Sequence, residues 1–404
     1  MSEVREQRRR GLVSMGVGLA AAGVGAAIGL AAERAAVGRA VRPEGAPGGP
    51  AVPHPAEPAF GTLRGAPMSV ATDDGATLHV EVDDAVPATT GRSRAAARPA
   101  DPLPTIVLCH GFALSMDSWH YQRAALRGSY RLVLWDHRGH GRSTPGPAGM
   151  ESFGRIAEDL ATVIGAAAPT GPLVLLGHSM GGMTIMALAR LRPELFAERV
   201  IGVGLISTSA GQLGRADLGV PGFGQLVMKV APVAVRALAR SPRLVAGSRR
   251  LGSDLEGVLV RRYSFGSKVS PELVTFAAQM IASTSVPVLS QFLPALSTHD
   301  EREALSVLDG IETLVMVGDA DLLTPPEQSE EIMHRLPGAE HVIVHDGGHL
   351  LMLEHPEVVT QHVVELLQRS LRANAGRPLP PGGRVRRSLT PLRRLGRGDR
   401  SGAA

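Results

Sequence analysis

Hydrophobic residues in the central part of the chain gather in short runs rich in β-branched side chains, and amphipathic stretches separate most of them. Runs typical of strands occur at residues 68–72, 77–82, 105–108, 131–135, 173–176, 200–206, 313–317 and 341–344. Apolar positions at helical spacing fall between them, for example at residues 151–167, 182–191, 326–335 and 357–372. An early pair of strands followed by strand–helix alternation predicts an α/β fold with a mostly parallel sheet and helices on both faces.

One long interval interrupts this alternation. Residues 208–305 contain apolar positions at helical spacing, as at 223–234 and 273–281, and no strand-like run. Structureless connections longer than about 15 residues are uncommon in a folded domain. We therefore expect a helical cap inserted above the carboxyl edge of the sheet, within one folded domain that covers residues 59–371.

The N-terminal part of the chain carries a long apolar segment. The segment from Leu12 to Ala32 has no charged residue, follows three arginines, and has about the 20 residues that a membrane-spanning helix needs. We interpret it as a membrane anchor, with a cleaved export signal and an Ala/Gly-rich leader as alternatives. The protein is therefore expected to be membrane-associated, and export or a cytoplasmic location are the alternatives. A Pro/Gly-rich linker completes the segment 1–58.

The positive charge lies at the two ends of the chain. The whole sequence has a net charge of +4 and a pI near 9.8, values that point to an anionic partner. Residues 1–42 hold seven arginines and three glutamates, and residues 372–404 hold nine arginines and one aspartate, so the remaining body carries −8. No nucleic-acid partner is therefore expected, and residues 372–404 are interpreted as a basic, disordered tail. The single cysteine, Cys109, excludes an internal disulfide or a multi-cysteine metal site.

The strongest chemical signal follows the strand-like run that begins at Leu173. The sequence Gly177-His178-Ser179-Met180-Gly181 fits the pattern G-x-S-x-G and runs directly into a helix. A serine in such a sharp strand-to-helix turn has a strained backbone, and Gly177 and Gly181 leave room for the neighbouring elements. The hydroxyl of Ser179 is then held clear of the sheet, at a helix N-terminus that can stabilise an anion.

With this motif the chain resembles the α/β-hydrolase family of esterase- and lipase-like serine hydrolases, over residues 60–371. The resemblance implies that Cys109-His110-Gly111-Phe112, after the third strand, forms part of an oxyanion hole. The implied donors are the backbone N–H groups of Phe112 and Met180, while His110 holds the loop and Gly111 supports it. The segment 136–143, DHRGHGRS, looks like the family's turn after the fourth strand, and its two histidines, His137 and His140, are interpreted as structural.

A serine nucleophile needs a general base and a group that orients the base. The family places the acid and then the histidine after the serine. His349 follows two glycines after the last strand-like run and is the expected base. Asp321 lies after the run at 313–317 and is the expected acid, whereas Asp319 is expected to shape the turn. Asp346 is too close to His349 along the chain to orient it.

These residues predict ester hydrolysis on small or lipid-like acyl substrates through an acyl-enzyme, with no cofactor and no metal. A cofactor-free haloperoxidase (perhydrolase) or a carbon–carbon bond hydrolase could use the same three residues, and a non-catalytic binding protein of this fold is a further alternative. Cys109 is interpreted as a core residue rather than a nucleophile. Residues that could line an apolar acyl pocket in the cap are Met228, Val230, Val233, Leu273, Phe276, Met280, Leu289 and Phe292.

Overall fold

The computed structural model describes residues 58–86, 103–147, 149, 152–211, 213, 253–376 and 386–389. Three parts of the sequence interpretation fall outside these residues and stay predictions. They are the anchor from Leu12 to Ala32, the linker up to residue 57, and the part of the cap that holds Met228, Val230 and Val233. Within the described residues, no single helix is long and apolar enough to cross a membrane; the cap helices over 271–283 and 286–298 pass that test only as a pair bent by 90°.

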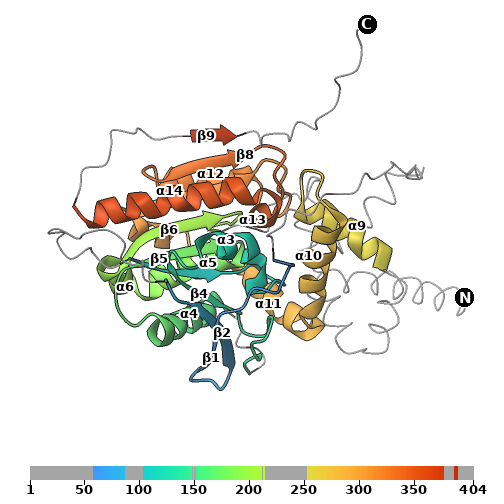
Figure 1. Cartoon of the computed structure of the whole chain (residues 1–404), viewed down its shortest axis with the longest axis horizontal. Coiled ribbons are helices and arrows are strands. Elements are labelled where there is room, and N and C mark those ends of the chain that lie inside the picture. Colours follow the sequence, from blue (N-terminus) through green and yellow to red (C-terminus); the bar gives the residue numbers. More distant parts are fainter. Residues whose placement is uncertain are drawn as a thin grey trace, which may run out of the picture.

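A nine-stranded sheet forms the centre of the molecule, in the order β1-β2-β4-β3-β5-β6-β7-β8-β9 (Figure 1). The pairs β1–β2 and β2–β4 are antiparallel, and all other neighbours are parallel. This arrangement confirms the predicted mostly parallel sheet. The strands are β1 Ala66–Ala71, β2 Thr77–Asp83, β3 Thr105–Cys109, β4 Arg131–Trp135, β5 Leu173–His178, β6 Val200–Ile206, β7 Glu312–Gly318, β8 Glu340–Val344 and β9 Arg386–Leu389.

Strand β9 lies in the tail that was expected to be disordered, and at these four residues the structure differs from that expectation. It pairs in parallel with β8, from His341 opposite Arg386 to Val344 opposite Leu389. Without it, β8 would end the sheet with unpaired backbone N–H and C=O groups, which favour the addition of a further strand. The short polar sequence Arg-Arg-Ser-Leu gave no strand signal. Tail residues 377–385 and 390–404 lie outside the described part of the chain.

Helices cover both faces of the sheet, as predicted. Alternate side chains of β3 point to opposite faces: Val107 belongs to the core under α4 (Phe153–Ala167), α5 (Met180–Leu191), α6 (Pro193–Glu198) and α12 (Pro326–Arg335). Ile106 and Leu108 belong to the opposite core. The helices of that second face are α3 His120–Leu126, α13 Leu351–Glu354 and α14 Pro356–Asn374.

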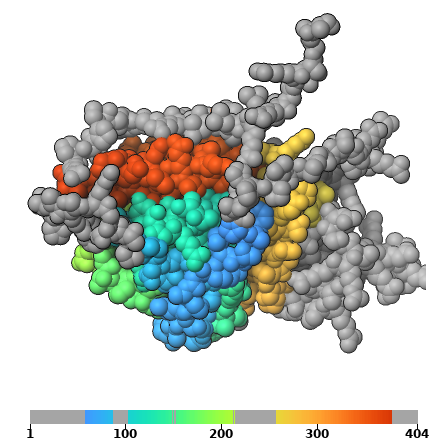
Figure 2. Space-filling model, in the orientation of Figure 1, coloured from blue at the N-terminus to red at the C-terminus, as the bar shows by residue number. Residues whose placement is uncertain are grey.

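The cap lies between β6 and β7 in the sequence and beyond the carboxyl ends of the parallel strands (Figure 1). Its described helices are α9 Ser253–Ser264, α10 Pro271–Ser283 and α11 Val286–Thr298. Figure 2 shows these helices, in yellow and orange, at one end of the described residues and beside the N-terminal described segment in blue. There the ring of Phe60 stacks on Phe276 of α10, with ring centroids 4.9 Å apart.

The two stems of the cap meet at its base. Gly211, after β6, forms an isolated antiparallel bridge with Asp300, which follows α11. The N–H of Glu301 also donates to the carbonyl of Ala210 at 2.7 Å. The insertion therefore leaves and re-enters the sheet layer at nearly one point.

Candidate active site

Ser179 occupies the turn between β5 and α5. Its backbone angles are φ 51° and ψ −117°, in the left-handed region that non-glycine residues rarely adopt. A Cβ on Gly177 would lie 2.5 Å from the nitrogen of Gly182, and one on Gly181 would overlap the carbonyl oxygen of Cys109. The two glycines therefore let strand, turn and helix approach closely enough to hold Ser179 in this strained conformation.

This close approach predicts that Gly181→Ala strongly lowers the stability of the protein. Because the new methyl group meets backbone atoms of β3, which cannot rotate away, we expect the free energy of unfolding to fall by about 3 kcal/mol. Gly165→Ala in α4 is the matched control, since nothing lies within 4 Å of that Cβ, and it should stabilise the helix by up to about 1 kcal/mol. Urea unfolding of both variants measures the difference, and equal midpoints would contradict the packing described for Gly181.

The structure brings together three predicted residues that are far apart in the sequence. His349 follows β8 and the glycine pair, and its Nε2 lies 3.0 Å from Ser179 Oγ. Its Nδ1 lies 2.9 Å from Oδ2 of Asp321, which follows β7. The carboxyl ends of parallel strands meet at one edge of a sheet, so β5, β7 and β8 deliver the three side chains to one place. The distances suit proton transfer from a hydroxyl to an imidazole that a carboxylate orients.

Asp321 is held as a carboxylate by several donors. Its Oδ1 accepts the N–H groups of Leu323 at 2.8 Å and Thr324 at 2.9 Å, and its Oδ2 accepts the Thr324 hydroxyl at 2.8 Å. Burial alone raises the pKa of Asp321, but the charge and hydrogen bond of His349, with the donors of Thr324, outweigh it and lower the pKa. The carboxylate is therefore ionised at neutral pH and can fix the orientation of the imidazole.

The predicted oxyanion loop lies against the serine turn. A Cβ on Gly111 would lie 2.7 Å from Nδ1 of the buried His178 and 3.2 Å from the Cβ of Ser179, so a side chain at this position would displace the serine turn. His110 Nδ1–H donates to the carbonyl of Gly111 at 2.7 Å, and His110 Nε2 accepts the N–H of His137 at 2.9 Å. Phe112 follows this loop directly. Met180 is the first residue of α5, where backbone N–H groups have no acceptor within the helix.

His178 was not singled out by sequence reasoning, although it is part of the serine motif. It is fully buried, and its Nε2–H donates to the backbone carbonyl of His349 at 2.9 Å. Its Nδ1 has no partner within the described structure and faces Gly111, where a Cβ would lie 2.7 Å away. Burial, with the nearby His349, lowers the pKa of His178 to about 3. A neutral imidazole thus ties the nucleophile strand to the His349 loop.

The remaining candidates lie beside the site rather than in it. Asp319 Oδ2 lies 2.7 Å from His345 Nδ1, and its Oδ1 accepts the N–H of Asp346 at 2.8 Å, a pattern that shapes the turn. His137 and His140 are fully buried, and burial lowers their pKa values to about 3 and about 4. Burial raises the pKa of the Cys109 thiol to about 12, so it offers no thiolate nucleophile at neutral pH.

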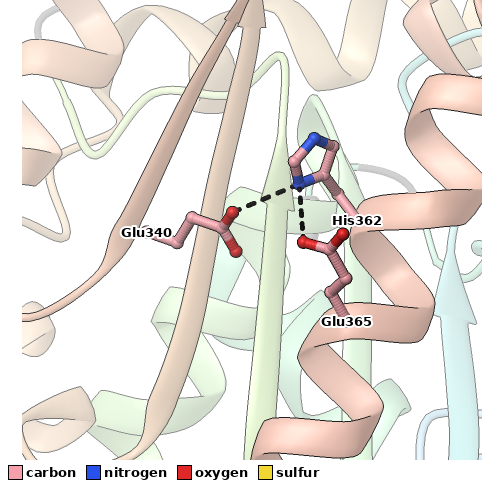
Figure 3. Close-up of side chains that lie close together, drawn as sticks. All are labelled: Glu340, His362 and Glu365. Atoms are coloured by element: carbon pink, nitrogen blue, oxygen red, sulfur yellow. Dashed lines mark hydrogen bonds and ion pairs between the residues drawn. The ribbon is translucent and has the colours of Figure 1, made fainter. Parts of the chain in front are cut away.

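One group of potential metal ligands occurs in the described part of the chain, formed by Glu340, His362 and Glu365 (Figure 3). His362 Nδ1 lies 3.2 Å from Glu340 Oε1 and 3.7 Å from Glu365 Oε2. The guanidinium of Arg369 lies 2.8 Å from the other oxygen of Glu340 and already balances its charge. Glu340 begins β8 whereas His349 follows its end, so this group is at the opposite edge of the sheet from Ser179.

Two further polar residues near His349 were missed. The hydroxyl of Thr324 lies 3.3 Å from His349 Nδ1, and the carboxylate of Glu354 accepts the N–H of Gly348 at 2.6 Å. The sequence does not distinguish Thr324 as a site residue, since threonine is common in turns. It does mark Glu354, because this residue is a lone charge at the end of the apolar run Leu350 to Leu353.

Comparison with known proteins agrees with this fold. A family model described as the alpha/beta hydrolase fold matches residues 104–356. A monoacylglycerol lipase of Mycolicibacterium smegmatis is 28% identical over 267 residues, 64% of this chain and 84% of the relative. A pimeloyl-acyl-carrier-protein methyl ester esterase of Yersinia enterocolitica is 26% identical over 273 residues, 66% of this chain and 93% of the relative. The solved structure of a thermophilic esterase from Thermogutta terrifontis matches with a TM-score of 0.58 at 24% identity, covering 75% of this chain and 98% of that one.

Proposed function

The chain is an enzyme of the α/β-hydrolase fold family, and on that premise we propose that it hydrolyses carboxylic esters with small or lipid-like acyl groups. In this proposal Ser179 is the nucleophile, His349 the general base and Asp321 the residue that orients it. The observation that carries the proposal is the continuous contact from Ser179 Oγ to His349 Nε2 at 3.0 Å and from His349 Nδ1 to Asp321 Oδ2 at 2.9 Å.

The first half of the proposed reaction forms an acyl-enzyme. Ser179 Oγ attacks the carbonyl carbon of the ester while His349 Nε2 takes the hydroxyl proton. The tetrahedral oxyanion accepts hydrogen bonds from the N–H groups of Phe112 and Met180. Asp321 stabilises the imidazolium without taking its proton. The carbon–oxygen bond to the alcohol then breaks, and His349 returns the proton to the leaving alkoxide.

Water completes the cycle. His349 removes a proton from the water as it attacks the acyl carbon, the same N–H groups hold the second oxyanion, and the imidazolium protonates Ser179 as the carboxylic acid leaves. The chain's own side chains and backbone thus account for each proton in both steps.

The preference for esters rests on the relatives and on the cap. The two named relatives are a lipase and a methyl ester esterase, both of which act on carboxylic esters by name. In this chain, five of the apolar residues predicted to line an acyl pocket are buried in the described part of the cap, namely Leu273, Phe276, Met280, Leu289 and Phe292. Phe292 also lies beside the proposed oxyanion loop, with its ring centroid 6.2 Å from that of Phe112.

A fluorophosphonate probe and a panel of p-nitrophenyl esters test the proposal. We expect the wild-type protein to hydrolyse the esters and to be labelled once, on the peptide that contains Ser179, because an activated serine attacks phosphorus as it attacks a carbonyl. Peracid formation and cleavage of a carbon–carbon diketone substrate are assayed on the same sample. Faster turnover in either assay would favour the perhydrolase or carbon–carbon hydrolase alternative, and a folded protein without labelling would contradict a serine hydrolase.

A further inference from the structure

Glu354 is a buried carboxylate that the proposed reaction does not use. It is the last residue of α13, and its side chain has an exposed fraction of 0%. Among the described residues, the one basic side chain within ion-pair distance is that of His355, whose Nε2 lies 4.0 Å from Glu354 Oε1. Burial of a charged group is unfavourable unless hydrogen bonds compensate it. The donors that surround Glu354 therefore indicate what it does.

These donors come from two different parts of the molecule. Glu354 Oε2 accepts the N–H of Gly348, the residue directly before His349, at 2.6 Å. Glu354 Oε1 accepts the hydroxyl of Ser267 at 2.7 Å and also the N–H of Ser267. Ser267 belongs to the cap, between α9 and α10. One carboxylate thus joins the loop of the proposed base to the cap.

The backbone around these contacts is packed without free space. A Cβ on Gly348 would lie 2.5 Å from the nitrogen of Gly266 and 2.6 Å from Cα of Phe265. The N–H of Leu350 donates to the carbonyl of Ser264 at 2.9 Å. The cap segment over residues 264–267 therefore rests directly on the His349 loop, and a shift of one must displace the other.

The peptide groups on both sides of His349 are fixed by buried side chains. Glu354 holds the N–H of Gly348 before it, and His178 Nε2–H holds the carbonyl of His349 itself at 2.9 Å. The contact to Glu354 has a charged acceptor, and such hydrogen bonds are among the stronger ones in proteins. The contact from His178 joins two neutral groups, and it is buried. Together the two contacts leave the imidazole little freedom to move away from Ser179.

We propose that Glu354 is a positioning residue that sets the place of His349 and transmits the position of the cap to it. The proposal rests on the proposed function, in which His349 is the general base. It extends that function by making catalysis depend on how the cap is seated: when Ser267 leaves Glu354, the Gly348 peptide loses part of its support and His349 loses its alignment with Ser179.

Glu354→Gln tests the positioning role. The amide keeps one acceptor oxygen, but its NH2 group must face either Gly348 N–H or Ser267 N–H, so one of the two contacts becomes repulsive. We expect kcat for a p-nitrophenyl ester and the rate of fluorophosphonate labelling to fall about 10- to 100-fold, while KM changes less than about twofold. A general loss of structure would instead reduce the amount of active enzyme and leave the kcat of the folded fraction unchanged.

Ser267→Ala and the double variant test the transmission from the cap. Ser267→Ala removes only the hydroxyl contact, and we expect kcat to fall about three- to tenfold with KM unchanged, because one charge-assisted hydrogen bond is lost. Since both substitutions act on the one link that joins the cap to the Gly348 N–H through residue 354, the double variant should have nearly the kcat of Glu354→Gln alone. If the fold-losses in kcat of the two single variants multiplied fully in the double variant, Ser267 and Glu354 would act independently, and the transmission from the cap through Glu354 would be overturned. Ser267→Ala also provides the test if Glu354→Gln does not fold, and a wild-type kcat would then overturn the proposal.

Glu365→Gln is the matched control, a glutamate in a hydrogen-bonded group at the opposite edge of the sheet, and its kcat should equal that of the wild type (Figure 3). A folded Glu354→Gln enzyme with wild-type kcat overturns the positioning role and leaves the proposed function intact. Failure of the wild-type enzyme to hydrolyse esters or to be labelled at Ser179 would instead contradict the proposed function. The two failures are therefore distinguishable.

Discussion

Replacing Ser179 with alanine should lower kcat for a p-nitrophenyl ester by about a million-fold, and His349→Ala should have a similar effect. In the proposed reaction each substitution removes the same covalent step: without Ser179 there is no nucleophile, and without His349 the hydroxyl proton has no acceptor 3.0 Å away. The double variant should be no slower than either single one, because groups that act as a unit are strongly non-additive. A residual rate above that in water, supplied by the proposed oxyanion donors, should remain in all three.

Ser207→Ala is the matched control for this experiment. Ser207 follows the neighbouring strand β6, has the same left-handed type of backbone with φ 46°, and its buried hydroxyl has no partner within the described structure. The kcat of the Ser207→Ala enzyme should stay within about twofold of the wild-type value. Purified variants are compared by initial rates, with active-site titration by the fluorophosphonate probe to exclude contamination. If Ser179→Ala kept more than about one per cent of the wild-type kcat, Ser179 would not be the nucleophile.

The second large effect concerns acid stability. We expect the protein to unfold as the pH falls from about 6 to about 4, because four fully buried histidines are neutral in the folded state. Burial lowers the pKa values of His137 and His178 to about 3 and of His140 to about 4, and it holds the pKa of His110 well below its usual range, with repulsion from neighbouring histidines. In the unfolded chain the same groups titrate near pH 6.5.

The direction in which stability changes with pH follows from proton uptake. Between the native and the unfolded pKa values, the unfolded chain binds more protons than the native one, so acid favours unfolding. The stabilisation is fully present above pH 6.5 and is lost as the pH falls toward 4 and 3. Asp136 and Asp159 act in the opposite direction, since burial raises the pKa of Asp136 to about 6 and also raises the pKa of Asp159, so both take up a proton first in the folded state. Burial lowers the pKa of His299, which adds to the loss and offsets one of these two carboxyl groups. The net loss is about 4 kcal/mol per pH unit, which exhausts a typical stability within two to three units.

Urea unfolding at pH 7, 6 and 5 measures this loss. His140→Phe is the control, because His140 packs edge to face against Phe292 with ring centroids 5.2 Å apart, and a phenyl ring can keep this aromatic contact while it has no group that titrates. That variant should lose about 1.4 kcal/mol less per pH unit than the wild type, even though it also loses the hydrogen bond from His140 Nδ1 to the carbonyl of Arg138. A free energy of unfolding that stays constant from pH 7 to pH 5 would contradict the buried neutral histidines.

The fold could be predicted from the sequence because its elements are strongly patterned. The strand-like runs at 173–176 and 341–344 lie within β5 and within β8, and both sit directly before a glycine-rich turn. Strand β9 could not be predicted, because its pairing with β8 depends on a tertiary contact and not on its own polar sequence. Nor does the sequence indicate which helices share a face, since that depends on how the crossovers wind.

The candidate site was predictable to the extent that it lies in motifs. Ser179, Asp321 and His349 each follow a strand, and the parallel sheet brings strand ends together whatever their separation along the chain. Glu354 and His178 contact backbone groups of the His349 loop. The sequence marks Glu354 only as a lone charge after an apolar run and gives no sign of the contact made by His178. What each residue contacts becomes visible only when the direction of a peptide N–H or C=O is known.

The bridge between Gly211 and Asp300 makes the cap a module. Since the two stems already touch, the free-energy cost of closing the inserted loop increases by only about 0.6 kcal/mol for each doubling of its length. Insertions can therefore lengthen, shorten or replace the cap in the course of evolution while the sheet and its strand ends stay in place. Substrate preference can change by exchanging this module, subject to one condition from the proposed role of Glu354: a new cap must still present a hydrogen-bond donor where Ser267 now lies.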